Sequence, residues 1–286
     1  MIKFDKDTKI LIVGLGLIGG SYAKALTKRG CQVSAITLNE NDIKYALEGG
    51  FISRGTTELD PGLIQGADMI VFALYPTVFI DWIKENQHLF APGTLITDVS
   101  GVKGSVVSAV QGMLREDVEF ISAHPMAGRE QSGVEFSDDK VFCGANYIVT
   151  PTEKNTPEAI ETCKALGHAL GFGRITELSP EKHDEMIGFL SQLTHCIAVS
   201  LMTSNCEEGL EKYTGDSFRD LTRIAKINDV MWSELFLMNK YELLKQMDAF
   251  EDEFRRLRRY ILEGNREEMQ KMMRSSTERR KKFDKI

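Results

Sequence analysis

The sequence has little that would indicate a secreted, membrane-spanning or nucleic-acid-binding protein. Its 286 residues include five scattered cysteines without a C-x-x-C pair, which predicts buried thiols in a reducing compartment and no metal site. No uninterrupted apolar run reaches the roughly 18 residues of a membrane span. The formal net charge of -7 provides no general basic field for nucleic acid. These absences predict a soluble, cytoplasmic protein whose partners include neither a membrane nor a nucleic acid.

The composition that is present is that of a globular protein. Apolar residues make up 42% of the chain and charged residues 27%, which is enough material for a substantial core. The length predicts one large domain or two smaller ones. Because the net charge is negative, any anionic ligand must be held by a local cluster of positive groups.

Short apolar runs and helical stretches alternate over about the first 150 residues. The runs are rich in β-branched residues and too short for helices, so they predict buried strands. Alternation of strand and helix predicts an α/β Rossmann-type, doubly wound parallel sheet. The predicted strands cover residues 9–13, 32–38, 69–74, 94–99, 118–123, 146–150 and 173–178.

The pattern changes after residue 178, because no convincing strand follows. Helical periodicity is present at about 180–204, at 217–226 and from 231 to 264, and the charged tail also reads as an amphipathic helix. We therefore predict a dinucleotide-binding domain at 1–178 and an all-α C-terminal domain at 179–286. The apolar stripes of such a domain are expected to pack against another subunit.

A glycine motif, G-x-G-x-x-G, follows the first predicted strand. Gly14 would form the tight turn, Gly16 would let the backbone approach a pyrophosphate, and Gly19 would allow close packing of helix on strand. The motif is weak alone, but its place between a strand and a helix supports dinucleotide binding over a structural turn. The predicted cofactor-binding residues are Gly14, Leu15, Gly16, Leu17, Ile18, Gly19 and Thr37.

Thr37 bears on the choice between NAD and NADP. It stands where the second strand of such a fold usually ends on an acid that holds the adenosine ribose. The absent carboxylate removes the usual barrier to a 2′-phosphate, whereas Glu40 and Asp42 would repel one. We therefore favour NAD and leave NADP open.

His124 follows the predicted strand 118–123, so the sequence places it at the carboxyl edge of the sheet, where ligands bind. Pro125 makes the exit from the strand rigid and removes a backbone donor. This placement predicts a base or hydrogen-bond acceptor facing the nicotinamide. The alternative is a histidine that is hydrogen bonded within the turn.

The helix predicted at 180–204 carries a second polar cluster. Asp184, Gly188, Ser191 and His195 are three or four residues apart and would share one face, which predicts a lined cleft. The alternative is a core histidine with a buried partner.

A third cluster lies in the segment 217–225. Asp220 and Arg223 are three residues apart and can pair, and Trp232 follows. An arginine beside an aromatic wall suits a carboxylate on a hydrophobic ring. A surface ion pair is the alternative.

Together these residues resemble the prephenate/arogenate dehydrogenase family of tyrosine biosynthesis, and most closely its monofunctional prephenate dehydrogenases. The resemblance extends over nearly the whole chain. The motifs "GLGLIGGS", "HPMAG", "HD" at 183–184, "SQLTH" and "FRDLTRIA" occur in the order and spacing of the family.

The resemblance implies NAD(P)-dependent oxidative decarboxylation of prephenate to 4-hydroxyphenylpyruvate. His124 matches the catalytic histidine of the family, and His195 matches the second active-site histidine. Arg223 matches the arginine that holds the ring carboxylate, Asp220 matches its partner, and Trp232 follows at the matching place. The family also implies a homodimer formed through the helical domain.

The chain departs from the family near two of these residues. Gly101 stands where the family has a substrate-binding serine, so Ser100, one position earlier, is the candidate for that contact. Arg129 stands where many members have a small polar residue. Because prephenate has two carboxylates, we predict that Arg129 binds the side-chain carboxylate and that Glu130 orients Arg129. A solvated surface pair is the alternative.

Three other functions fit parts of the pattern. Arogenate dehydrogenase would act on the amino-acid analogue of prephenate. β-Hydroxyacid and imine reductases share the architecture, but they use a helical lysine where this chain has His195. A redox-sensing dinucleotide binder would have no use for two histidines and an arginine at one cleft.

Overall fold

The computed structural model describes residues 4–129 and 131–284. The chain divides into two compact units, Met1–Asn239 and Lys240–Ile286, which are described separately below. The domain boundary predicted after residue 178 falls inside the first unit and stays a prediction.

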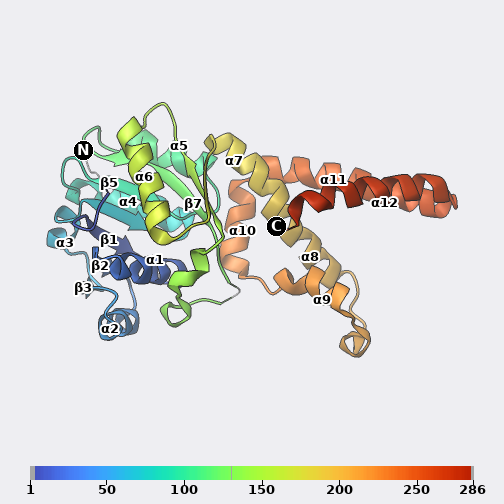
Figure 1. Cartoon of the computed structure of the whole chain (residues 1–286), viewed down its shortest axis with the longest axis horizontal. Coiled ribbons are helices and arrows are strands. Elements are labelled where there is room, and N and C mark those ends of the chain that lie inside the picture. The colour runs from blue at the N-terminus through green and yellow to red at the C-terminus, as the bar shows by residue number, and fades with distance from the viewer. Residues whose placement is uncertain (1–3, 130, 285–286) are drawn as a thin grey trace. The chain divides into compact units, whose positions relative to one another are not determined.

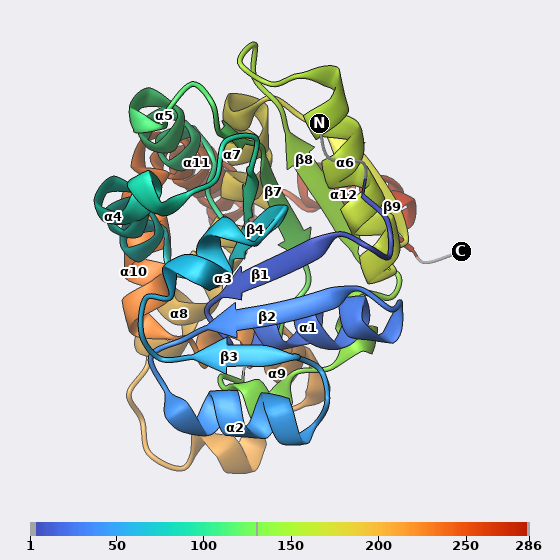
Figure 2. The ribbon, with the colours of Figure 1, turned by 90° about the vertical axis from the view of Figure 1, so that its left-hand side faces the viewer.

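The first unit is built on a six-stranded sheet in which all neighbouring strands are parallel. The order is β3-β2-β1-β4-β5-β6, the doubly wound order of dinucleotide-binding folds. Figure 2 shows β1, β2 and β3 side by side. The predicted Rossmann-type sheet is therefore confirmed. The strands are β1 (Lys9–Val13), β2 (Gln32–Ile36), β3 (Arg54–Thr56), β4 (Met69–Phe72), β5 (Leu95–Asp98) and β6 (Glu119–Phe120).

Helices cover both faces of this sheet, which explains why the strands read as continuous apolar runs. Ile10 and Ile12 of β1 belong to a core on one face, and Leu11 between them belongs to a core on the other. α1, α2 and α6 contribute to the first core, and α3, α4 and α5 to the second. The helices are α1 (Leu17–Lys28), α2 (Glu40–Glu48), α3 (Pro61–Gln65), α4 (Pro76–Asn86), α5 (Gly104–Met113) and α6 (Pro157–Leu170).

A second, three-stranded sheet corrects the predicted position of His124. β7 (Ser122–Met126) pairs antiparallel with β8 (Asn146–Thr150), which pairs parallel with β9 (Arg174–Glu177). The strand predicted at 118–123 is therefore divided between two sheets, and His124 lies opposite Ile148 within β7 rather than after a strand end. Pro125 is accommodated because β7 is at the edge of its sheet, where a missing backbone donor is tolerated.

The remainder of the first unit is helical. It consists of α7 (Pro180–Ile187), the π-helical turn η4 (Gly188–Gln192), α8 (Leu193–Thr203), α9 (Asp216–Thr222), the 3₁₀ turn η6 (Arg223–Ala225) and α10 (Asp229–Met238). Ser179 caps α7 by accepting from the backbone N–H of Lys182. The run Pro180–Thr203 also has the length and mean hydropathy, 1.4, of a membrane span, although polar residues interrupt its apolar sequence. However, His183, Asp184 and Gln192 of this run are buried and hydrogen bonded within the unit.

The second unit is a pair of helices, α11 (Lys240–Leu262) and α12 (Arg266–Arg280), which lie side by side (Figure 1). Gly264 has a φ of 62° in the turn between them, and Asn265 caps α12. The single helix predicted from 231 to 264 is interrupted at Asn239. The side-chain amide of this residue is buried and donates to the Asp184 carbonyl oxygen and to Gln192 Oε1.

The five cysteines are all free thiols, but their predicted burial holds only in part. Cys31 and Cys163 are buried, and burial raises the pKa of Cys163 to about 11, so its thiolate is scarce at neutral pH. Cys143, which forms an isolated bridge with Phe172, and Cys206, in the loop after α8, are exposed, and the prediction is wrong for them.

A fully buried ion pair lies at the carboxyl end of β5. Lys103 Nζ is 2.9 Å from Asp98 Oδ2 and also donates to the Ala123 carbonyl oxygen at 2.7 Å. The hydroxyl groups of Ser100 and Ser122 donate to the same Asp98 carboxylate. Burial lowers the pKa of Lys103, and the Asp98 carboxylate opposes this shift. The pair therefore joins β5, the start of α5 and β7 beside His124.

We predict that Lys103→Met lowers the free energy of unfolding by about 3–5 kcal/mol, because Asp98 would stay buried without its counter-ion. Urea denaturation measures the change. Lys28→Met is the matched control, since it removes an exposed bridge to Asp139 and should change stability little. Equal losses in the two variants would contradict the importance of the buried pair.

Candidate active site

Three glycines shape the turn from β1 into α1. Gly14 has a φ of 98°, and a Cβ there would lie 2.5 Å from the Ala73 carbonyl oxygen. A Cβ on Gly19 would lie 1.9 Å from the Gly14 carbonyl oxygen. By contrast, a Cβ on Gly16 meets no described atom within 4 Å. The fold itself therefore requires Gly14 and Gly19, whereas Gly16 leaves a space that a ligand can enter.

This open space lies at the N-terminus of α1, of which Gly16 is the N-cap. Among the described residues no side chain caps this terminus, so its first N–H groups are available to an anion. Leu15 and Leu17 are buried and Ile18 packs against the core, so these residues anchor the turn and offer a ligand their backbone. The arrangement fits a dinucleotide pyrophosphate.

Thr37 lies directly after β2, at the place where a bound adenosine ribose is expected. Its backbone N–H donates to the Thr56 carbonyl oxygen at 3.2 Å, which fixes the chain direction there. The next side chain, Leu38, is 94% exposed, and Asn39 caps α2. The role of Thr37 in ribose recognition stays a prediction.

His124 is held by a second histidine. Its Nδ1 lies 2.8 Å from Nε2 of His183. Burial holds the pKa of His124 well below its usual range, and positive charge on His183 or Lys103 would lower it further. The imidazole is therefore neutral at neutral pH and can accept a proton.

His183 and Asp184 of α7 extend this contact into the protein. His183 is fully buried, and its Nδ1 lies 2.8 Å from Asp184 Oδ1. The Asp184 carboxylate also accepts the backbone N–H groups of Lys103 and Gly104, each at 2.8 Å. Burial lowers the pKa of His183, and its hydrogen bond to Asp184 opposes the shift.

His183 and Lys103 belong to the site although neither was predicted as a site residue from the sequence. The signal for His183 was a histidine beside an acid in the first turn of a helix, in a chain with five histidines. The signal for Lys103 was a lysine shortly after a buried strand that ends on an acid. Neither signal identifies the partner, because the partners are remote in sequence.

His195 lies on α8 and contacts the predicted aromatic wall. Its ring stacks on Trp232 of α10 with 3.7 Å between ring centroids, and its Nδ1 donates to the Ser191 carbonyl oxygen at 2.9 Å. Trp232 also contacts Phe236. The structure therefore brings two predicted site residues together.

The face predicted to join Asp184, Gly188, Ser191 and His195 is interrupted. The π-helical turn η4 lies between Asp184 and His195. Such a turn adds a residue to the helical repeat, so positions before and after it do not keep the regular spacing. Asp184 accordingly faces the start of α5, whereas His195 stacks on α10.

α10 connects the two histidines. Leu235 lies three residues after Trp232 and therefore on the same side of the helix. A Cβ on Gly101 would lie 3.5 Å from a methyl group of Leu235 and 3.9 Å from Cε1 of His124. One helix thus contacts His195 at Trp232 and reaches the loop beside His124 at Leu235.

Arg223 is the first residue of η6, which packs against α8, the helix of His195. Asp220 is exposed and forms no ion pair within the described part of the chain, so its predicted pair with Arg223 is not formed here. The reason is that α9 ends at Thr222, and Arg223 leaves the regular helical spacing. In α9 itself, Arg219 pairs with Asp216 at 3.0 Å.

Ser100 and Arg129, the candidates at two positions where the chain departs from the family pattern, also have partners within the protein. Ser100 is buried, and its hydroxyl contacts the Asp98 carboxylate and the Val102 carbonyl oxygen, so its hydrogen-bonding capacity is used inside the protein. Arg129 is partly exposed and pairs with Asp138 at 2.8 Å. Glu130, predicted to orient Arg129, lies outside the described residues.

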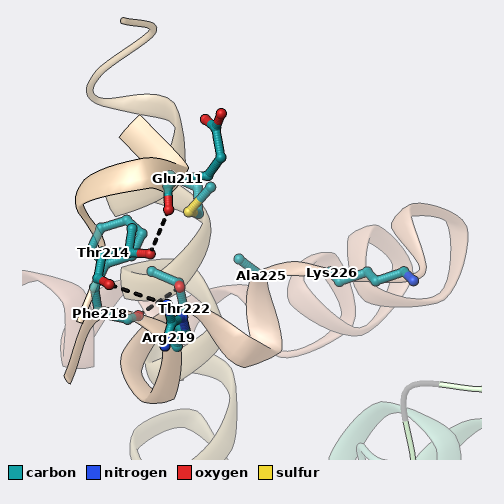
Figure 3. Close-up of a pocket in the computed structure, with 8 residues that line it drawn as sticks. Glu211, Thr214, Phe218, Arg219, Thr222, Ala225 and Lys226 are labelled. Atoms are coloured by element: carbon teal, nitrogen blue, oxygen red, sulfur yellow. Dashed lines mark hydrogen bonds between the residues drawn. The ribbon is translucent and has the colours of Figure 1, made fainter. Parts of the chain in front are cut away.

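A cavity of about 550 Å³ opens elsewhere, beside α9 (Figure 3). Phe218, Arg219 and Lys226 are among the residues that line it. Arg219 is held there by the Thr214 carbonyl oxygen as well as by Asp216. Its lining includes none of His124, His195 and Arg223, so this cavity is separate from the candidate active site.

Comparison with known proteins identifies the family. The model of the prephenate dehydrogenase nucleotide-binding domain matches residues 22–174, and that of the prephenate dehydrogenase dimerization domain matches residues 179–275. The chain belongs to the prephenate dehydrogenase family. The resemblance inferred from the motifs is confirmed, and with it the enzyme class and the dinucleotide-binding fold.

Individual relatives agree with this assignment. The chain is 32% identical to the prephenate dehydrogenase of Bacillus subtilis (strain 168) over 92% of its length and 72% of the relative. It is 28% identical to the cyclohexadienyl dehydrogenase of Zymomonas mobilis over 88% of each chain. A crystal structure of prephenate dehydrogenase from A. aeolicus in complex with hydroxyphenyl propionate and NAD+ superposes with a TM-score of 0.88. That structure is 31% identical, and the match covers 97% of this chain and 98% of that one.

We predict that Gly16→Val abolishes NAD binding, because the branched side chain would fill the open space at the N-terminus of α1. Stability should change little, since no described atom lies within 4 Å of the added Cβ. Calorimetry with NAD and urea denaturation measure the two effects. Gly112→Val is the matched control: this glycine on α5 has equally open surroundings, and its variant should bind NAD normally. Retained binding in Gly16→Val would mean that the glycine turn has only a structural role.

Proposed function

We propose that the chain catalyses the NAD-dependent oxidative decarboxylation of prephenate to 4-hydroxyphenylpyruvate. The observation that carries this proposal is His124, a neutral imidazole whose Nδ1 is bonded to His183. Its Nε2 is then the nitrogen that meets a substrate. Membership of the prephenate dehydrogenase family supplies the substrate class.

In the proposed reaction, His124 removes the proton of the C4 hydroxyl group of prephenate. A base placed in this way contributes about 10²–10⁴-fold to the rate. The Gly14–Gly19 turn would hold the dinucleotide, which would supply the acceptor for the hydride from C4. The electron pair of the bond to the ring carboxylate then completes the aromatic ring, and CO₂ leaves.

Residues on the helices hold the substrate in this proposal. Arg223 binds the ring carboxylate as a charge-assisted pair. The stacked rings of His195 and Trp232 form a flat wall that suits the cyclohexadiene ring. Asp220 is exposed, so we assign it an electrostatic role near Arg223 rather than a direct bond.

The test is the increase in NADH absorbance with prephenate and then arogenate, each with NAD and then NADP. We expect the reaction with prephenate and NAD, and we expect His124→Asn to lower kcat by about 10²–10⁴-fold. NAD affinity should stay nearly intact in this variant. A variant with normal kcat and a raised KM for NAD would make His124 a cofactor residue instead.

Arogenate is the second candidate substrate, because the Zymomonas relative carries the broader name cyclohexadienyl dehydrogenase. Both compounds share the ring carboxylate and the C4 hydroxyl, and they differ in the side chain. The same assay therefore decides between them. The reductase alternative loses support, since Lys103, which is buried near His124, is already paired with Asp98.

The depressed pKa of His124 predicts how activity responds to acid. The base works in its neutral form, so activity is lost as the pH falls through the pKa of His124. Because burial lowers that pKa, kcat/KM should stay level down to about pH 6.5, the usual value for histidine, and fall only below it. A pH profile of kcat/KM measures this, and an acid limb with its midpoint above pH 6.5 would contradict it.

Arg129 remains our candidate for the side-chain carboxylate, in competition with its bond to Asp138. We predict that Arg129→Ala lowers kcat/KM for prephenate roughly ten- to hundredfold and changes KM for NAD little, since a bidentate pair is worth about 1.5–3 kcal/mol. Asp138→Asn is the matched variant, because it removes the competing partner and keeps Arg129. An unchanged KM for prephenate in Arg129→Ala, with Arg223→Ala severely impaired, would mean that Arg129 is a surface residue and does not bind the substrate.

The active form is proposed to be a cytoplasmic homodimer that joins through the helical part of the chain. The family model that matches residues 179–275 is described as a dimerization domain. Within the second unit, Phe254, Ile261 and Leu262 are exposed apolar side chains that such an interface would cover.

A further inference from the structure

A chain of hydrogen bonds runs from His124 to the backbone of α5. His124 Nδ1 contacts His183 Nε2 at 2.8 Å, and His183 Nδ1 contacts Asp184 Oδ1 at 2.8 Å. The two oxygens of Asp184 also accept from the N–H groups of Lys103 and Gly104. Three side chains and one helix start are therefore connected in a fixed order.

The acceptor at the end of this series of hydrogen bonds determines which ring nitrogen of each histidine carries hydrogen. An ionised carboxylate accepts and cannot donate, so His183 must carry its hydrogen on Nδ1. A neutral His183 then presents a lone pair on Nε2. His124 must in turn donate from Nδ1, which leaves the lone pair on its own Nε2. The opposite tautomer of His124 would point an N–H at the substrate hydroxyl and could not remove its proton.

We infer that His183 and Asp184 are positioning residues that lock His124 in the tautomer able to act as a base. This inference rests on the proposed function for its catalytic meaning. The hydroxyl proton moves to Nε2 of His124, so the O–H bond breaks and an imidazolium forms. His183 accepts the remaining Nδ1–H throughout, and the proton on Nε2 passes to the phenolate oxygen that forms when CO₂ leaves, which restores the neutral imidazole.

The surroundings of Asp184 explain why its carboxylate can serve as the fixed acceptor at the end of the hydrogen bonds that start at His124. Its negative charge lies at the N-terminus of α5, where two backbone N–H groups and the helix dipole stabilise an anion. The ammonium group of Lys103 neutralises Asp98 nearby. The Asp184 carboxylate is therefore held by two backbone donors, while burial lowers the pKa of both histidines.

The direct test is the tautomer of His124 in the wild-type holoenzyme. The chain has five histidines, so ¹⁵N-histidine labelling and two-bond ¹H–¹⁵N correlation spectra with bound NAD can resolve each ring. His124→Asn and His183→Gln assign the two signals. We expect both rings to be neutral with hydrogen on Nδ1. Hydrogen on Nε2 of His124 would overturn the inference, and this measurement needs no turnover and no substituted partner.

Kinetics provide a second, independent test. His183→Gln can place an amide oxygen where Nε2 was, so it keeps an acceptor for His124. His183→Phe keeps a ring of similar size and removes the acceptor. We expect kcat within about tenfold of wild type for the glutamine variant and a loss of about 10²-fold or more for the phenylalanine variant, with KM for NAD unchanged. His168→Gln, an exposed histidine on α6, is the matched control.

The outcomes separate this inference from the proposed function. If the glutamine and phenylalanine variants lose kcat equally, His183 acts by packing and the inference is overturned. If the wild-type enzyme oxidises neither prephenate nor arogenate, the proposed function fails. The spectra then still decide whether His183 and Asp184 set the tautomer.

Discussion

The buried ion pair between Asp98 and Lys103 is the interaction on which the site depends. It connects the end of β5, the start of α5 and the backbone of β7 through one ammonium group. Replacing it with apolar residues would remove two charges, but breaking it would leave one charge buried. Because Lys103 Nζ holds the Ala123 carbonyl oxygen, the pair also fixes the residue that precedes His124.

The same few residues keep the candidate base neutral. Asp184 accepts two backbone N–H groups at the start of α5. Burial lowers the pKa of His183, although the hydrogen bond to Asp184 opposes that shift. His124 is then bordered by a neutral ring and lies near a lysine that is already paired. Burial of this kind opposes protonation of both histidines. The role proposed for His124 requires its neutral form, because only a neutral imidazole can accept the hydroxyl proton.

The site is assembled from three parts of the first unit with separate tasks. The parallel sheet and α1 provide the open space at Gly16. The small second sheet carries His124 on its edge strand, which leaves one side of that strand accessible. α8 and α10 add the stacked pair of His195 and Trp232. The stacked pair therefore belongs to different elements from the glycine turn between β1 and α1.

The sequence by itself determined what depends on local patterns. Glycine spacing, apolar runs and helical periodicity predicted the Rossmann-type sheet, the helical second half and the residues at the cofactor turn, because each is set by neighbours along the chain. Only the tertiary structure decided the transfer of β7 to a second sheet, the π-helical turn that divides Asp184 from His195, and the absence of the expected Asp220 pair in the described residues. It also decided the bonds of His124 to His183 and of Asp184 to Lys103, which join residues 59 and 81 positions apart. Such pairings arise from long-range packing, and a local pattern does not specify which distant partner a side chain meets.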